Sequence, residues 1–200
     1  MKPIYSSICG SSRRASKGGL FGLVLISIAL SSCLPTSENG VDSPQGSEVE
    51  TSPYLGTWEV VQLLNMTDVA QSTLTVSNGS GGSVQAVVQD ATGSVTYDCF
   101  LTQIDQDVVM SERDTSAAGE IWTIYKIDLQ QSGQELRVYG MDEDKIMNDI
   151  DLEVLDGEYE ILEEANIIRI QETSQGLRTY LENQSGVFES DPLMVFGKSQ

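Results

Sequence analysis

The chain has 200 residues, of which 30 are acidic and 11 basic, and its formal net charge is −19. Such a charge repels phosphate backbones, so nucleic-acid binding is disfavoured. The chain contains no histidine, which removes the usual general base, the Ser-His arrangement and most zinc sites. Only two tryptophans are present to line a sugar-binding cleft. We therefore expect no enzyme, no catalytic residue and no cofactor.

An apolar run of residues 18–30 dominates the N-terminal part. Four basic residues precede it, and no acidic residue occurs before Glu38. A basic flank, an apolar middle and a small-residue end are typical of a secretory signal. Two alternatives exist. A transmembrane helix would need roughly 20 apolar residues, more than the run provides. Twin-arginine export is suggested by Arg13-Arg14, although Ala15 and Ser16 stand where large apolar residues usually follow the pair.

The end of this run, Leu30-Ser31-Ser32-Cys33, resembles the bacterial lipobox, in which a peptidase cuts before a cysteine that carries acyl chains such as palmitate. The resemblance implies a signal peptide over residues 1–32 and a lipoprotein anchored to the membrane through Cys33. Leu34 follows the cysteine, where an aspartate would usually retain a lipoprotein in the inner membrane. The expected location is therefore the cell envelope, in the outer membrane facing the periplasm or the cell surface.

The mature chain would carry all 30 acidic residues but only seven basic ones, because four of the 11 precede Cys33, and its net charge would be −23. Residues 34–53 are rich in Ser, Pro, Gly and Glu, so we expect the acylated cysteine and a flexible tether over residues 33–53, followed by one domain over residues 54–200. Cys99 is the one cysteine left in this domain, which excludes an internal disulfide.

From residue 54 onward, apolar and polar residues alternate with a period of two, which predicts half-buried antiparallel strands. Gly-rich or Asp-Gly turns separate these runs, and Asp156-Gly157 reads as a two-residue hairpin. Eight or nine strands at this spacing predict an all-β meander that closes as a barrel or folds as a sandwich. The apolar faces expected to share a side of a strand are Trp58, Val60 and Leu64; Val84, Ala86 and Val88; Val95, Tyr97, Cys99 and Leu101; Ile121, Tyr125, Ile127 and Leu129; and Ile150, Leu152 and Val154.

A single helix fits the C-terminal part. Thr173-Ser174 is a plausible cap, and Leu177, Tyr180 and Leu181 stand at helical spacing. Arg178 lies four residues before Glu182, which favours an ion pair along the helix. Gly186 can end this region, and the apolar run of residues 193–196 predicts a closing strand.

The motif Gly56-Thr57-Trp58 at the start of the first strand, followed by the meander, one helix and a closing strand, resembles the lipocalin-like group of small β-barrels. The resemblance implies that Trp58 closes one end of the barrel and that an arginine from the last barrel strand packs across it. Arg169 is the predicted partner, and an arginine over an indole gains roughly 0.5 to 2 kcal/mol. The chain has no match to the group's Thr-Asp-Tyr motif. The alternative is that Trp58 anchors the core of some other barrel.

The densest acidic stretch, residues 142–156, offers the hard oxygen ligands that Ca²⁺ binds. The loop pattern of an EF-hand fails because Val154 stands at the position of the required glycine. Asp149, Asp151 and Glu153 alternate as the solvated outer face of a strand would, so we expect no metal there. Cys99 falls on an apolar face and has no histidine to activate it. We therefore expect its side chain to pack in the hydrophobic core and not to act as a nucleophile.

Two functions remain open. The first is a non-catalytic, lipid-anchored binding module whose barrel holds a small apolar or amphipathic ligand. The second is a structural or assembly lipoprotein with a solid barrel, whose acidic face binds a protein or polysaccharide partner. The small residues Val84, Ala86 and Cys99 allow a cavity, whereas Tyr97 and Tyr125 would fill a narrow barrel.

Overall fold

The computed structural model describes residues 34–41, 49–63, 72–90, 93–114, 121–162 and 166–199. The apolar run and Cys33 of the predicted lipobox lie outside the described residues, as do residues 42–48 of the predicted tether. Within the described residues, no helix is long and apolar enough to cross a membrane.

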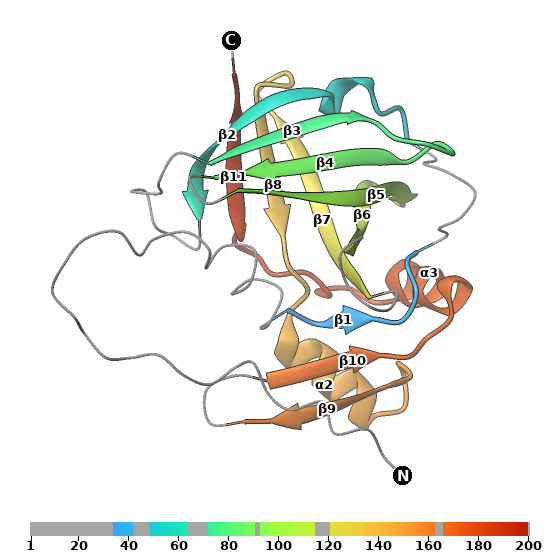
Figure 1. Ribbon diagram of the computed structural model, residues 1–200. Coiled ribbons are helices and arrows are strands. Elements are labelled where there is room, and N and C mark those ends of the chain that lie inside the picture. Colours follow the sequence, from blue (N-terminus) through green and yellow to red (C-terminus); the bar gives the residue numbers. More distant parts are fainter. Residues whose placement is uncertain are drawn as a thin grey trace, which may run out of the picture.

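The predicted fold class is confirmed: eight antiparallel strands form a closed β-barrel (Figure 1). Seven consecutive strands form the meander, and β11 closes it by pairing with both β8 and β2. Alternating side chains let each strand bury one face inside the barrel. The barrel strands are β2 (Gly56–Leu63), β3 (Thr73–Asn78), β4 (Val84–Gln89), β5 (Ser94–Ile104), β6 (Asp107–Asp114), β7 (Trp122–Gln130), β8 (Glu135–Tyr139) and β11 (Met194–Lys198).

An insert lies between β8 and β11. It contains α2 (Glu143–Asp151), β9 (Gly157–Ile161), β10 (Asn166–Ile170) and α3 (Ser174–Asn183). Strand β10 pairs with β9 on one side and with the short strand β1 (Thr36–Ser37) on the other, and β1 also pairs with β7. The insert is therefore joined to the barrel wall through the N-terminal segment (Figure 1).

The apolar residues form two separate cores. The inner core fills the barrel, and the outer core lies between the outer wall of β5, β6 and β7 and the insert. The inner core consists of Tyr54, Trp58, Val76, Val84, Ala86, Cys99, Leu101, Tyr125, Ile127, Leu136, Val138 and Phe196. The outer core consists of Val41, Ile104, Val109, Ile124, Met141, Ile146, Leu155, Ile168, Ile170, Leu177, Tyr180, Leu181 and Val187.

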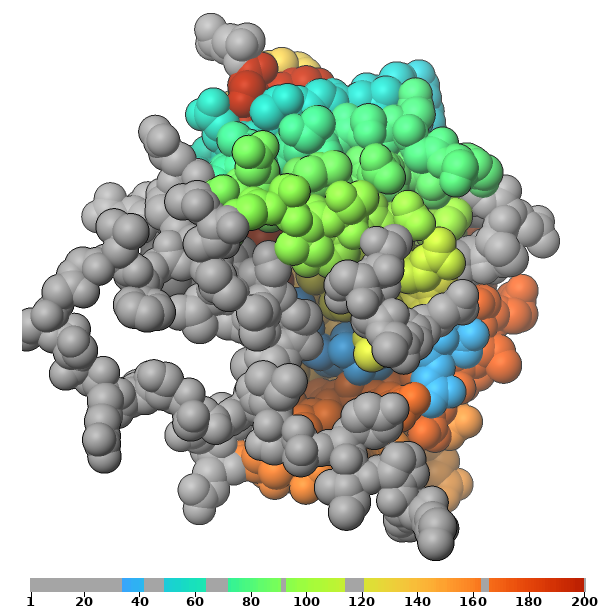
Figure 2. All heavy atoms as spheres, in the orientation of Figure 1, coloured from blue at the N-terminus to red at the C-terminus, as the bar shows by residue number. Residues whose placement is uncertain are grey.

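Residues 34–41 correct the predicted flexible tether, because they are part of the folded domain. Val41 is fully buried. Its N–H donates to Ser111 Oγ at 2.9 Å, and its carbonyl accepts from Thr102 Oγ1 at 3.3 Å. Figure 2 shows this segment in blue between the barrel strands in green and the insert in orange. Composition misled here, because these few residues bury against surfaces that come from far along the chain.

The helix α3 was predicted correctly. Thr173 is its N-cap and accepts from the Gly176 N–H at 3.0 Å, and Arg178 donates to Glu182 at 2.9 Å. Its predicted apolar face is buried against the outer core. The predicted closing strand is also confirmed as β11.

The strand predicted around Ile150, Leu152 and Val154 is wrong. Ile150 lies in α2, while Leu152 and Val154 follow that helix and are exposed. Asp142 caps α2 by accepting from the Lys145 N–H at 2.9 Å, and acidic residues fill its first turn, which suits the positive end of a helix. The period-two pattern was accidental, because it spans the last turn of α2 and the exposed turn that follows the helix.

The predicted hairpin at Asp156-Gly157 is wrong as well. Gly157 begins β9, and the true hairpin joins β9 to β10, with Gly157 opposite Ile170. A Cβ on Gly157 would lie 2.8 Å from the Arg169 carbonyl oxygen, so the glycine permits close approach of two strands and makes no turn. Ile121, predicted to be on the buried face of β7, precedes that strand and is exposed.

Candidate ligand site at the open end of the barrel

One end of the barrel is sealed around Trp58. The 3₁₀ helix η1 (Ser52–Tyr54) crosses this end, and Trp58 Nε1 donates to the Tyr54 carbonyl at 2.9 Å. The indole is fully buried, and Lys198 Nζ lies 4.9 Å from the centre of its ring. This end therefore combines a satisfied indole N–H with a cation over the ring face.

The predicted pairing of Arg169 with Trp58 is wrong. Arg169 lies on β10, outside the barrel, and its guanidinium forms an ion pair with Glu38 at 2.8 Å. The last barrel strand is β11, and its Lys198 stands opposite Trp58 in register. A cation does lie over the indole, but it is a lysine of β11, because the strand that closes the barrel comes after the insert.

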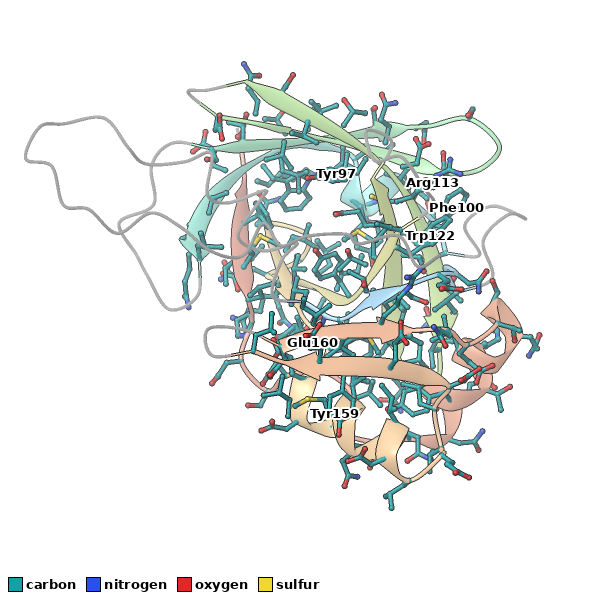
Figure 3. All side chains as sticks on the ribbon, turned by 60° about the horizontal axis from the view of Figure 1, so that its bottom comes forward. Tyr97, Phe100, Arg113, Trp122, Tyr159 and Glu160 are labelled. Carbon is teal, nitrogen blue, oxygen red and sulfur yellow. The ribbon has the colours of Figure 1, made fainter. Side chains whose placement is uncertain are left out.

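The opposite end, which we call the open end, lies where β2 and β8 end and β11 begins. There the strand register places Glu112 opposite Cys99 on one side and opposite Thr123 on the other. Cys99 belongs to the inner core, so Glu112 faces the barrel interior. Tyr97 and Tyr125 face the same way, and Figure 3 shows Tyr97 inside the barrel.

Several interior-facing residues of β4, β5 and β6 are only half-buried. They are Val88, Val95, Tyr97 and Glu112. These residues therefore keep part of their surface in contact with solvent. Leu34, Val49 and Leu193 pack against the inner core. A Cβ on Gly140, at the end of β8, would lie only 2.9 Å from Leu34 Cδ2, so Leu34 occupies the space beside this glycine at the barrel edge.

The ionisable side chains at the open end shift one another's pKa. Burial raises the pKa of Tyr125 well above its ordinary value, and the negative charge of Glu112 raises that pKa further. Burial and Glu112 together also raise the pKa of the Cys99 thiol well above its ordinary value. A second negative charge beside Glu112 is therefore disfavoured. The side chains around Glu112 suit a cation or a hydrogen-bond donor.

Cys99 itself is buried and carries a free thiol, as expected for core filler. A thiolate is the reactive form of cysteine, and the raised pKa suppresses it.

The acidic stretch behaves differently from the predicted solvated face. Asp149 is buried in the outer core, where it accepts from Tyr180 Oη at 2.6 Å and pairs with Lys145 Nζ. Burial alone would raise the pKa of Asp149, but the hydrogen bonds from Lys145 and Tyr180 outweigh it and hold the pKa below its usual value. Among the described residues, no group of three or more metal-ligating acidic or cysteine side chains comes together.

A second aromatic group lies on the outer wall of the barrel. The rings of Phe100 and Trp122 are 5.8 Å apart, and the Arg113 guanidinium lies 5.5 Å from the Trp122 ring centre (Figure 3). Arg113 also pairs with Asp98 at 2.9 Å. Trp122 is buried. This group packs the wall, and it leaves no open aromatic face at Trp122 for a ligand.

Sequence reasoning missed Glu112. The alternation of Val108, Met110 and Glu112 through residues 107–114 places a carboxylate on the same face as two apolar residues, and that was the available signal. It was ambiguous, because Val109 and Ser111 on the other face are buried too.

Comparison with known proteins adds no relative: no family model matches the chain, and neither a curated protein nor a solved structure matches it.

Proposed function

We propose that the chain is a lipid-anchored envelope lipoprotein that works as a non-catalytic binding module, with its ligand site at the open end of the barrel. The observation that carries the proposal is the inward-facing, half-buried Glu112, which lies among Tyr97, Tyr125 and Thr123. A few convergent polar groups on an apolar wall are typical of ligand sites.

The side chains at the open end indicate the class of ligand. Apolar residues such as Val88 and Val95 would contact an apolar body, and Glu112 would accept from a cationic or hydrogen-bond-donating head group. The predicted charge of the mature chain, −23, would attract such a cation. The deep half of the barrel is occupied by Trp58, Leu101 and Phe196, all buried. The proposed ligand is therefore a small amphipathic molecule held near the open end.

The anchor in this proposal rests on the lipobox resemblance at Cys33. Cys33→Ala in the full chain is expected to abolish acylation and to release the protein from the membrane fraction. Intact-mass measurement checks this directly. Acylation that persists in the variant would refute the anchor.

Native mass spectrometry of the wild-type protein, extracted from its own membranes in detergent, tests the ligand. Covalent acyl chains survive denaturation, whereas a bound ligand is lost, so a stoichiometric mass that disappears on unfolding supports the proposal. Glu112→Gln should lower the occupancy. Glu59→Gln, on the outer face of β2, is the matched control and should not. A bare mass in wild type would favour a solid barrel that binds a protein or polysaccharide partner through its acidic face.

A further inference from the structure

Strand β9 is the last strand of the sheet and pairs on one side only, with β10. Within the described part of the chain, every other strand of this sheet has a partner on both sides. Figure 1 shows β9 as the lowest strand in the view, with β10 and β1 above it. We call the outer side of residues 157–161 the β9 edge.

The backbone of β9 presents hydrogen-bonding groups along this edge. The Gln171 N–H donates to the Asp156 carbonyl at 2.9 Å, just before the first register pair of β9 and β10. Hydrogen-bonded pairs recur at every second residue of an antiparallel ladder, so residues 158 and 160 also bond to β10. The residues whose N–H and C=O groups point outward are therefore Gly157, Tyr159 and Ile161. No hydrogen bond from another described residue reaches these backbone groups.

Two exposed glutamates lie on one face of β9. They are Glu158 and Glu160, and Figure 3 shows Glu160 on the opposite face of the strand from Tyr159. Glu158 stands opposite Arg169, but the Arg169 guanidinium pairs with Glu38 at 2.8 Å. Among the described residues, neither glutamate of β9 forms an ion pair. Both carboxylates therefore remain available to a cation.

The two glutamates decide which strand can pair with the β9 edge. A second copy of the chain that paired antiparallel about Tyr159 would place its Glu160 opposite Glu158 and its Glu158 opposite Glu160. Like charges directly opposite each other in a sheet are destabilising, and charged side chains commonly protect an edge strand from self-association. The edge thus disfavours a second copy and favours a strand with lysine or arginine at every second position. The net charge of −19 attracts such a strand.

The other face of β9 lies beside the end of α2. Tyr159 Oη donates to Asp151 Oδ1 at 2.8 Å. The turn that follows Asp151 carries two exposed apolar side chains, Leu152 at 64% and Val154 at 45%. Successive side chains of a strand point to opposite faces, so a strand added at the edge would direct every second side chain toward this side. Apolar residues suit those positions.

We propose that the β9 edge binds an extended segment of a basic protein partner by adding it to the sheet as a further strand. Lysines or arginines of that segment stand opposite Glu158 and Glu160, and the apolar residues between them lie on the side of α2. The outward backbone groups of residues 157, 159 and 161 form the hydrogen bonds. The edge lies outside the barrel, so this interaction is independent of the ligand site at the open end.

Amide hydrogen exchange at single residues, followed by NMR on the full chain, tests the proposal. In the free protein the N–H groups of Tyr159 and Ile161 should exchange fast, and those of Glu158 and Glu160 slowly. The probe is a short capped peptide of alternating lysine and valine. Its addition should slow the exchange at Tyr159 and Ile161 and leave the exchange at Glu158 and Glu160 unchanged.

Two double variants separate strand addition from general attraction by charge. Glu158→Gln with Glu160→Gln should weaken peptide binding about fivefold in fluorescence anisotropy, because two cross-strand ion pairs are lost. Asp105→Asn with Asp107→Asn removes the same charge from the exposed turn between β5 and β6 and is the matched control. The control should change the affinity by less than about twofold.

A proline tests the contribution of the backbone. Ile161→Pro removes an outward N–H but no hydrogen bond to β10, so it should weaken peptide binding by about tenfold while the barrel stays folded. Ile161→Ala keeps the N–H and is the control, and it should weaken binding by less than about threefold.

Four results would overturn the proposal. Slow exchange of Tyr159 and Ile161 in the free protein would mean that the edge is already paired. Peptide binding that leaves both of these amides in fast exchange would place the peptide elsewhere. Equal losses of affinity for the glutamate pair and the aspartate pair would reduce the interaction to net charge. Absence of peptide binding at low ionic strength would exclude a basic strand at this edge.

Discussion

The inner and outer cores are built on different principles. The inner core is made of consecutive strands that each bury every second residue, and its sealed end is held by local contacts such as Trp58 to Tyr54. The outer core joins residues from both ends of the chain, and buried polar groups take part in it: Ser111 and Thr102 hold Val41, and Asp149 holds Tyr180. An alternating pattern of residues can therefore specify a barrel, whereas a layer that packs on the outside of the barrel needs partners that are distant in sequence.

Truncation of Trp58 tests the inner core and should have the largest effect. Trp58→Ala removes a fully buried indole, its hydrogen bond and the surface beneath Lys198, and we expect a loss of about 4 kcal/mol in the free energy of unfolding. Chemical denaturation measures this. Val61→Ala, three residues along the same strand and 53% exposed, should cost less than about 0.5 kcal/mol. Similar losses for both variants would contradict the sealed end.

Asp149 tests the polar part of the outer core. Asp149→Ala leaves the buried Tyr180 hydroxyl and Lys145 without their acceptor, and we expect a loss of about 3 kcal/mol. Asp151→Ala, two residues later and exposed, should change the free energy of unfolding little. If the two aspartates behaved alike, both would belong to a solvated face, as the sequence pattern had indicated.

The same carboxylate predicts a pH dependence. The pKa of Asp149 is held below its usual value of 3.8 in the folded state, so the unfolded chain takes up the proton first as the pH falls. Its contribution is therefore complete above the unfolded pKa and is lost as the pH falls through the folded pKa. The difference in unfolding free energy between wild type and Asp149→Asn should shrink below about pH 4. A difference that stays constant down to pH 2 would contradict the shifted pKa.

Val41 tests whether the N-terminal segment belongs to the fold. Val41→Ala removes two buried methyl groups from the outer core, and a loss of about 2 kcal/mol is expected. Val154→Ala, which truncates an exposed valine, is the control and should be nearly neutral. An unchanged stability for Val41→Ala would return residues 34–41 to the role of a tether.

The cation over Trp58 should give the smallest effect. Lys198→Met keeps the apolar stem but removes the charge 4.9 Å from the ring centre, and we expect a loss of about 1 kcal/mol. Arg169→Met removes only an exposed ion pair with Glu38 and should cost at most about 0.5 kcal/mol. If Arg169→Met lowered the denaturation midpoint more than Lys198→Met, the result would favour Arg169 as the cation that packs on Trp58.

The barrel, the helix α3 and the closing strand were predictable because their signals are local. Thr173 caps a helix whose apolar stripe has a period of 3.6, and Val84, Ala86 and Cys99 alternate along pleated strands. The site was predictable only in part. Trp58 was found from its motif, but Lys198 and Glu112 became visible only once strand pairing showed which residues lie opposite each other.

The sequence by itself determined the periodicities, the caps and the charge, since these depend on neighbours within a few residues. Tertiary structure alone decided that Leu34 and Val41 join the domain, that Asp149 is buried in α2, and that the insert separates the last two barrel strands. The physical reason is that a short polar segment or a lone carboxylate has no burial preference of its own. Its place depends on the free energy it gains from a surface assembled elsewhere in the chain, such as Ser111 for Val41 and Tyr180 for Asp149.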